Sequence, residues 1–231
     1  MGMKFGGEAA HECNCSRRSC PRQYLALSGF ALGGFLILHI AVNALGFWPR
    51  RFQAAINRNH ALGGALPLLE IGLIFLPLAV HVALGLRTLQ REQLRYGVKK
   101  HHHGSDLRQW LQRVTALILL LFIALHVATM HRWFCGRFDS GSAFRSASEA
   151  IRHFWQCLPP VHPANQLIVE LYMLSAAAAV YHLANGIATG AEVVGLAGTP
   201  AAQQRLWRAC LFGAPVLLVA ALAAVFAFAL R

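Results

Sequence analysis

Residues 62–86 read LGGALPLLEIGLIFLPLAVHVALGL and hold only one carboxylate, Glu70, and one imidazole, His81. A helix needs about 20 predominantly apolar residues to cross a hydrocarbon layer about 30 Å thick. A segment of this length and polarity is typical of a transmembrane helix. Ionisable side chains inside such helices are costly and usually functional, so both polar residues are candidate functional residues.

Four further segments have the same apolar character, and they lie at about 24–47, 110–130, 166–188 and 207–230. Of the 231 residues, 56% are hydrophobic and only 13% are charged, which excludes an ordinary soluble domain. We find no internal repeat, glycine-rich nucleotide loop or catalytic triad pattern. The sequence predicts an all-α polytopic membrane protein, with a polar tail at 1–23 and one five-helix transmembrane bundle at 24–231.

The positive charges predict the orientation in the membrane. The first apolar run follows a tail that contains Arg17, Arg18 and Arg22, so we expect no cleavable signal peptide and a cytoplasmic N-terminus. With that orientation the inner side holds 13 of the 21 Lys and Arg residues, as the positive-inside rule requires. We therefore expect a bacterial cytoplasmic-membrane protein with a periplasmic C-terminus. The net charge of +12 then indicates attraction to anionic lipid and not to nucleic acid.

Four of the five segments each contain one histidine, and these are His39, His81, His126 and His182. At 1.5 Å per residue, His39 and His126 lie about 22–24 Å from the inner surface, whereas His81 and His182 lie about 8–9 Å from it. We call the first two the outer pair and the last two the inner pair. The two levels are about 14 Å apart, so four side chains on four helices form two predicted pairs.

Two levels so far apart cannot share one metal, and axial ligation of two heme irons fits them better. Gly85 and Gly186 each follow an inner-pair histidine by four residues, which leaves room on that helix face for a flat macrocycle. We expect Pro77 to kink its helix and the carbonyl four residues before each histidine to orient the imidazole Nδ1. The competing interpretation, histidines that only form interhelical hydrogen bonds, is disfavoured by the matched depths.

Four motifs surround these histidines: FLILHIAVN at 35–43, LAVHVALG at 78–85, LQRVTALILLLFIALH at 111–126 and VYHLANG at 180–186. With them, the chain resembles over nearly its whole length the five-helix cytochrome b membrane-anchor subunit of bacterial succinate:quinone oxidoreductases. That family includes succinate dehydrogenases and quinol:fumarate reductases. The resemblance implies that His81 and His182 ligate a heme b near the cytoplasm, and that His39 and His126 ligate a second, distal heme b.

The resemblance also implies partners. A flavoprotein subunit with FAD and an iron–sulfur subunit would dock on the inner face, and the dicarboxylate chemistry would occur in the flavoprotein. This chain would exchange electrons with a membrane quinone, which we expect to be menaquinone, and higher oligomers are compatible with it. Both succinate oxidation and fumarate reduction fit. Two alternatives stay open: a diheme anchor of another oxidoreductase, such as a hydrogenase or formate dehydrogenase, and a heme carrier or transporter.

Carboxylates within the spans are candidates for proton exchange with quinone. Fumarate-reducing members of the family can carry a glutamate two residues before the fourth histidine, but here that residue is Val180, which argues against the same proton path. Glu70 and Glu170 instead precede His81 and His182 by 11 and 12 residues, toward the outer side. We expect them to serve quinone protonation, the alternative being helix stabilisation near the interface.

The cysteines divide between the two sides. Cys135 and Cys157 lie in the predicted outer loop, where a disulfide and two free thiols are both compatible with the sequence. Cys13, Cys15 and Cys20 have no strong zinc or ferredoxin spacing, and we interpret them as part of a reduced tail.

Overall fold

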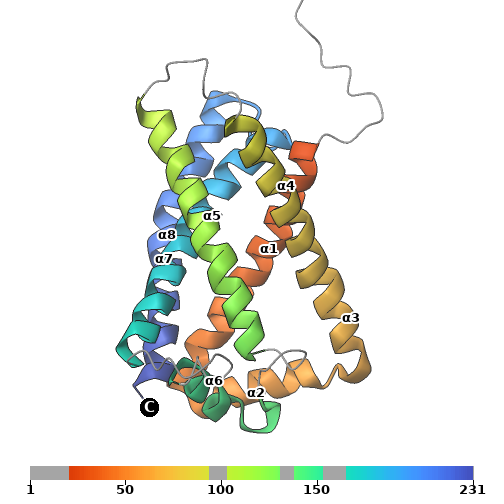
Figure 1. The fold of residues 1–231 in the computed structure, drawn as a ribbon, viewed down its shortest axis with the longest axis vertical. Helices are drawn as coiled ribbons and strands as arrows, with labels where there is room; N and C mark the ends of the chain where they lie inside the picture. Colours follow the sequence, from red (N-terminus) through yellow and green to blue (C-terminus); the bar gives the residue numbers. More distant parts are fainter. Residues whose placement is uncertain (1–20, 94–102, 131–137, 153–164, 231) are drawn as a thin grey trace, which may run out of the picture.

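The computed structural model describes residues 21–93, 103–130, 138–152 and 165–230, and these ranges contain helices and no strand (Figure 1). Five helical segments are long and apolar enough to cross a membrane, so the predicted all-α fold with five spans is confirmed. The spans are Pro21–Phe47, Ala65–Gln90, Leu107–Met130, Leu167–Val193 and Pro200–Ala229. We keep the names inner end, where the first span begins, and outer end, where it finishes.

The first, third, fourth and fifth spans are built around single long α-helices. These are α1 (Pro21–Ala44), α5 (His103–Met130), α7 (Asn165–Val193) and α8 (Pro200–Ala229). The last helix starts earlier than its apolar run suggested. Thr199 caps it by accepting a hydrogen bond from the Ala202 N–H, and Pro200 occupies the first turn, where its missing N–H costs nothing.

The second span is composite. It runs through α3 (Leu66–Glu70), a π-helical segment η3 (Ile71–Phe75) and α4 (Leu76–Gln93). Pro77 lies two residues after the end of the π-helical segment. Proline offers no N–H to the carbonyl of the residue four positions earlier. The absence of that hydrogen bond accounts for the wider, π-helical hydrogen-bond pattern just before Pro77.

The spans pack unequally on one another. Helix α7 contacts α1, α5 and α8, and α1 also contacts α4 and α8, whereas α4 stands apart from α5 (Figure 1). Glycines permit the close approach of α1 to α7: a Cβ at Gly33 would meet Leu183 at 2.6 Å, and one at Gly190 would meet Phe30 at 3.1 Å. The most apolar window of the second span has no buried residue, so protein covers little of that helix.

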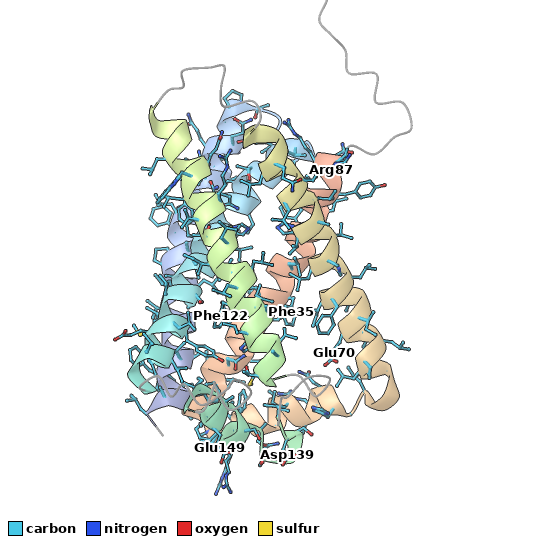
Figure 2. All side chains as sticks on the ribbon, in the orientation of Figure 1. Phe35, Glu70, Arg87, Phe122, Asp139 and Glu149 are labelled. Carbon is cyan, nitrogen blue, oxygen red and sulfur yellow. The ribbon has the colours of Figure 1, made fainter. Side chains whose placement is uncertain are left out.

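Aromatic side chains line the outer half of the bundle. Phe35 of α1 and Phe122 of α5 lie at a similar level there (Figure 2). Each is close to a histidine of the outer pair, with ring centroids 5.4 Å apart in both cases. The outer half therefore contains a continuous group of aromatic rings shared by neighbouring spans.

Two short helices lie across the outer end, and we call them together the outer cap (Figure 1). They are α2 (Pro49–His60), which follows the 3₁₀ turn η1 (Leu45–Phe47), and α6 (Ala143–Arg152), which follows the 3₁₀ turn η4 (Ser140–Ser142). Another 3₁₀ turn, η2 (Gly63–Ala65), leads into the second span. The cap was not predicted, because short helices with many polar residues have no transmembrane hydropathy signal.

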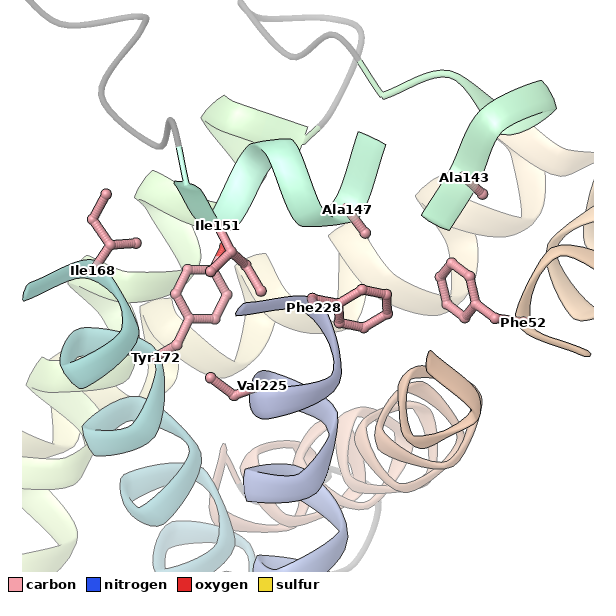
Figure 3. Close-up of a cluster of buried hydrophobic side chains, with 8 residues drawn as sticks. All are labelled: Phe52, Ala143, Ala147, Ile151, Ile168, Tyr172, Val225 and Phe228. Atoms are coloured by element: carbon pink, nitrogen blue, oxygen red, sulfur yellow. The ribbon is translucent and has the colours of Figure 1, made fainter. Parts of the chain in front are cut away.

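The outer cap is fastened by apolar packing and by one glutamine. Buried residues of both cap helices meet the outer ends of α7 and α8 (Figure 3). The cluster consists of Phe52, Ala143, Ala147, Ile151, Ile168, Tyr172, Val225 and Phe228. The Gln53 side chain accepts a hydrogen bond from the Ala143 N–H at 2.9 Å and donates one to the Ser140 carbonyl at 2.6 Å, which joins α2 to the start of α6.

Candidate functional site

The outer pair lies side by side between the first and third spans. His39 is in α1 and His126 is in α5, and their ring centroids are 6.1 Å apart with an angle of 84° between the ring planes. Both histidines lie in the outer part of their helices, His39 five residues before the end of α1 and His126 four residues before the end of α5. The structure thus brings together two imidazoles that are 87 residues apart in the sequence.

The inner pair has almost the same geometry. His81 of α4 and His182 of α7 have ring centroids 6.3 Å apart and ring planes at 78° to each other. The helix directions place this pair toward the inner end of the bundle, at a different level from the outer pair. Two equivalent two-histidine arrangements are therefore stacked along the bundle.

These spacings fit axial ligation of one iron by each pair. Two imidazoles on opposite sides of a metal, with metal–nitrogen bonds of about 2 Å, would have ring centroids roughly 6 Å apart. Among the described residues no group of three or more His, Cys, Asp or Glu side chains is placed to hold a metal ion. Two ligands suffice for heme, because the macrocycle supplies the equatorial nitrogens. The donor set therefore suits heme better than a bare cation.

The His81 ring is held by α1, and its partners fix its tautomer. Its Nδ1 lies 3.2 Å from the Leu25 carbonyl and 3.2 Å from Ser28 Oγ. The Ser28 hydroxyl already donates to the Leu25 carbonyl at 3.0 Å, so both neighbours of Nδ1 are acceptors. The proton must then be on Nδ1, which leaves the Nε2 lone pair available to a metal.

The His182 ring is held by α5 in the same way. Its Nδ1 lies 3.3 Å from Thr115 Oγ1, and that hydroxyl donates to the carbonyls of Leu111 at 2.7 Å and Gln112 at 3.1 Å. With its one proton directed to these carbonyls, the hydroxyl can accept from Nδ1–H, and that tautomer leaves Nε2 free for a ligand bond. The carbonyl four residues before the histidine, which we expected to orient Nδ1, is not the partner for either inner histidine. That carbonyl belongs to the histidine's own helical ladder, whereas the observed partners come from neighbouring helices.

A polar network fixes the helix that carries His182. Gln112 donates to the His182 carbonyl at 3.2 Å and accepts from Asn185 Nδ2 at 2.9 Å. Arg108 donates to Asn185 Oδ1 through Nη2 at 2.9 Å, and its guanidinium lies 4.3 Å from the Trp207 ring centroid. The network joins α5, α7 and α8 at the inner end and restrains the backbone of α7 beside the inner pair.

The two rings of the outer pair have different surroundings. His126 Nδ1 lies 3.2 Å from the Tyr172 hydroxyl, and the Phe122 ring stacks beside His126 with 19° between the planes. The His39 ring contacts Phe35 and His126, and within the described residues it has no hydrogen-bond partner. Within the described residues, the hydrogen bond that restrains the outer pair therefore acts on the His126 ring.

The glycines near the inner pair differ in the space that surrounds them. A Cβ at Gly85 would meet nothing within 4 Å, and one at Gly186 would meet only Gln112 Nε2 at 3.7 Å, so both positions leave open space beside their helices. Gly29, which was not predicted, is tighter: a Cβ there would lie 3.1 Å from His81 Cε1. Close packing of His81 on α1 thus depends on a glycine from another span.

The two candidate carboxylates occupy different environments. Glu70, the last residue of α3, is half-buried, and its side chain is on the side of α3 that faces the other helices (Figure 2). Glu170 is exposed on α7, beside Leu167, Leu171 and Leu174. The structure therefore does not bring them into one site, and Glu70 is the better placed of the two for a site inside the bundle.

The partners of the imidazoles were missed in the sequence, although the depth argument that paired the histidines extends to them. Ser28 and Thr115 lie within about two helical turns of the inner end, and Tyr172 lies at a comparable distance from the outer end.

Val180 is buried, with 4% of its surface exposed. The predictions on the cysteines of the tail and the outer loop concern Cys13, Cys15, Cys20, Cys135 and Cys157, which lie outside the described residues.

The chain is similar to the succinate dehydrogenase cytochrome b558 subunit of Bacillus subtilis (strain 168). The two are 27% identical over 213 residues, which cover 90% of this chain and 95% of that protein. No protein-family model and no solved structure matches the chain. The similarity spans nearly the full length of both proteins, so it includes the helices that carry the two pairs.

Proposed function

We propose that the chain is the cytochrome b membrane-anchor subunit of a succinate:quinone oxidoreductase. It would carry electrons between an iron–sulfur partner subunit and a membrane quinone, menaquinone in this proposal, through two heme b groups. The similarity to the Bacillus subtilis subunit supports this function. FAD, the iron–sulfur clusters and the dicarboxylate site would belong to the partner subunits at the inner face.

The observation that carries the proposal is the repeated geometry of the two pairs. Centroid separations of 6.1 and 6.3 Å fit axial ligation of one iron between each pair. His81 and His182 would hold the inner heme, and His39 and His126 the outer heme. Heme supplies reversible one-electron transfer when it is bound, and two such groups at different depths suit electron transfer across the bilayer.

The protein residues would orient the ligands and keep their protons in place. Acceptors on α1 and α5 would hold the proton of each inner imidazole on Nδ1 and leave its Nε2 available to bind the iron. Gly85 and Gly186 leave space on the helices of the inner pair for the macrocycle. The second span is little covered by protein, which fits a helix that contacts a cofactor on the side toward the bundle and lipid on the opposite side.

Quinone chemistry also requires protons, and Glu70 is our candidate for that exchange. It is half-buried on the face of α3 toward the bundle, at the end that holds the outer pair. A carboxylate in such a place can pass a proton to or from a quinone while the electron enters or leaves. Glu170 is a second candidate, and its exposed position makes it the weaker one.

Purification from the native membrane with its bound partners tests the proposal, followed by heme quantitation and a redox titration. We expect two heme b per chain with distinct midpoint potentials, together with a flavoprotein and an iron–sulfur protein. His39→Ala and His81→Ala should each remove one heme. His60→Ala changes an exposed histidine of α2 and should leave both hemes in place.

Other outcomes would identify the competing functions. Two hemes with hydrogenase or formate dehydrogenase subunits would assign the chain to a different oxidoreductase. A chain without stoichiometric redox-active heme would contradict the proposal and favour a heme carrier or transporter.

A further inference from the structure

We propose that Tyr172 is a positioning residue that tunes the outer heme site through His126. This inference rests on the proposed function, because it concerns the ligand that His126 would provide. It adds a residue from the fourth span to a site whose two histidines come from the first and third spans.

Tyr172 is placed for this role by contacts on several sides. Its side chain is buried in α7, and its ring belongs to the apolar cluster that joins the outer cap to α7 and α8 (Figure 3). Its ring packs edge-on against Phe122 with centroids 4.9 Å apart, and the hydroxyl lies 3.2 Å from His126 Nδ1. Packing therefore fixes the ring, and the ring delivers its oxygen to the imidazole.

The direction of the hydrogen bond follows from the ligand role of His126. If Nε2 binds iron, the imidazole proton is on Nδ1, and Nδ1–H must donate to the phenolic oxygen. An acceptor at this nitrogen makes the imidazole a stronger electron donor. A stronger donor stabilises ferric iron relative to ferrous iron, so the hydroxyl lowers the midpoint potential of the outer site.

Tyr172 also supplies the hydroxyl that contacts the outer pair. Within the described residues the His39 ring has aromatic neighbours and no hydrogen-bond partner. The inner pair differs, since acceptors reach both of its rings. Removal of one oxygen at Tyr172 should therefore alter the outer site without an equivalent group to compensate for it.

The test is a redox titration of the purified complex that carries Tyr172→Phe. This substitution keeps the ring and its packing and removes only the hydroxyl. We expect both hemes to be retained and one of the two components to shift to higher potential. At a fixed ambient potential the ratio of reduced to oxidised heme in that component should rise about tenfold, which corresponds to about 59 mV for a one-electron couple.

Thr115→Val provides the matched control for the inner pair. It removes the hydroxyl next to His182 Nδ1 and keeps the branched shape of the side chain. It should shift the component that Tyr172→Phe leaves unchanged. The inference is overturned if Tyr172→Phe shifts neither component, shifts the same component as Thr115→Val, or loses a heme. Absence of heme from the unmodified complex would instead refute the proposed function, so the two failures are distinguishable.

Discussion

The ring planes of His39 and His126 are nearly perpendicular, at 84°, and those of His81 and His182 are at 78°. Each ring is carried by a different helix, and neighbouring side chains restrain it: Phe35 contacts His39, whereas Thr115 contacts His182. The angle between the two ring planes of a pair is therefore set by the packing of the helices and of their neighbouring side chains.

Perpendicular axial rings should be visible in the electron paramagnetic resonance spectrum of the oxidised complex. When the two ring planes cross at a right angle, the iron orbitals that they perturb stay close in energy. We expect two highly anisotropic low-spin signals, each with a large maximum g value. Two rhombic signals, which parallel rings give, would contradict the observed orientation of both pairs.

Gly29→Val should displace His81 from its place on α1. The Cβ alone would lie 3.1 Å from His81 Cε1, and the valine methyl groups add bulk at the same point. We expect the complex to retain one heme and to lose most of the inner one, measured by heme quantitation and redox titration. Gly34→Val is the matched control on the same helix, because nothing lies within 4 Å of a Cβ there. Equal heme loss in both variants would show that valine in α1 is harmful by itself.

Asn185→Leu should destabilise the inner end while both hemes stay bound. Asn185 is buried and joins Arg108 to Gln112, so leucine leaves two polar groups without this partner. A lost buried hydrogen bond costs about 1–3 kcal/mol. Thermal unfolding of the purified complex should occur at a lower temperature. Thr189→Val, which removes a hydroxyl bonded to its own helix, should have little effect. An unchanged unfolding temperature for Asn185→Leu would show that the network contributes nothing to stability.

Gln53→Leu should loosen the outer cap. It removes the acceptor of the Ala143 N–H and the donor to the Ser140 carbonyl, at a cost of about 1–3 kcal/mol. We expect faster amide hydrogen exchange across 138–152. Arg145→Ala is the contrast in the same helix. It breaks an exposed ion pair with Glu149, and such pairs contribute little to stability. Equal exchange rates in the two variants would assign the attachment of α6 to apolar packing alone.

Sequence reasoning reached the spans and the histidine pairs because both depend on quantities that are constant along a helix. Apolar length gives the spans, and the fixed rise per residue gives the depth of each histidine. The outer cap was out of reach, since α2 and α6 are short and Gln53 joins segments 87 residues or more apart in the chain. Depth brings the Nδ1 partners to the level of the histidines but does not select them among the residues at that level. Thr115 contacts His182 because α5 and α7 are each rotated about their own axes so that these two side chains face each other. Hydropathy does not encode that rotation.

Glu70→Gln should slow quinone turnover and leave both hemes bound, because the amide keeps the shape of the side chain and cannot exchange a proton in the same way. Glu170→Gln is the matched control. It lies in α7 and is exposed, whereas Glu70 is half-buried on the bundle side of α3. Turnover with a soluble quinone analogue, measured beside the heme content, separates proton exchange from assembly. We expect a loss of about tenfold or more for Glu70→Gln, with the 10²–10⁴-fold that acid–base groups typically contribute as the upper range, and a smaller change for Glu170→Gln. Unchanged turnover in Glu70→Gln would remove that carboxylate from the quinone reaction, and a larger loss in Glu170→Gln would move the site to the exposed face of α7.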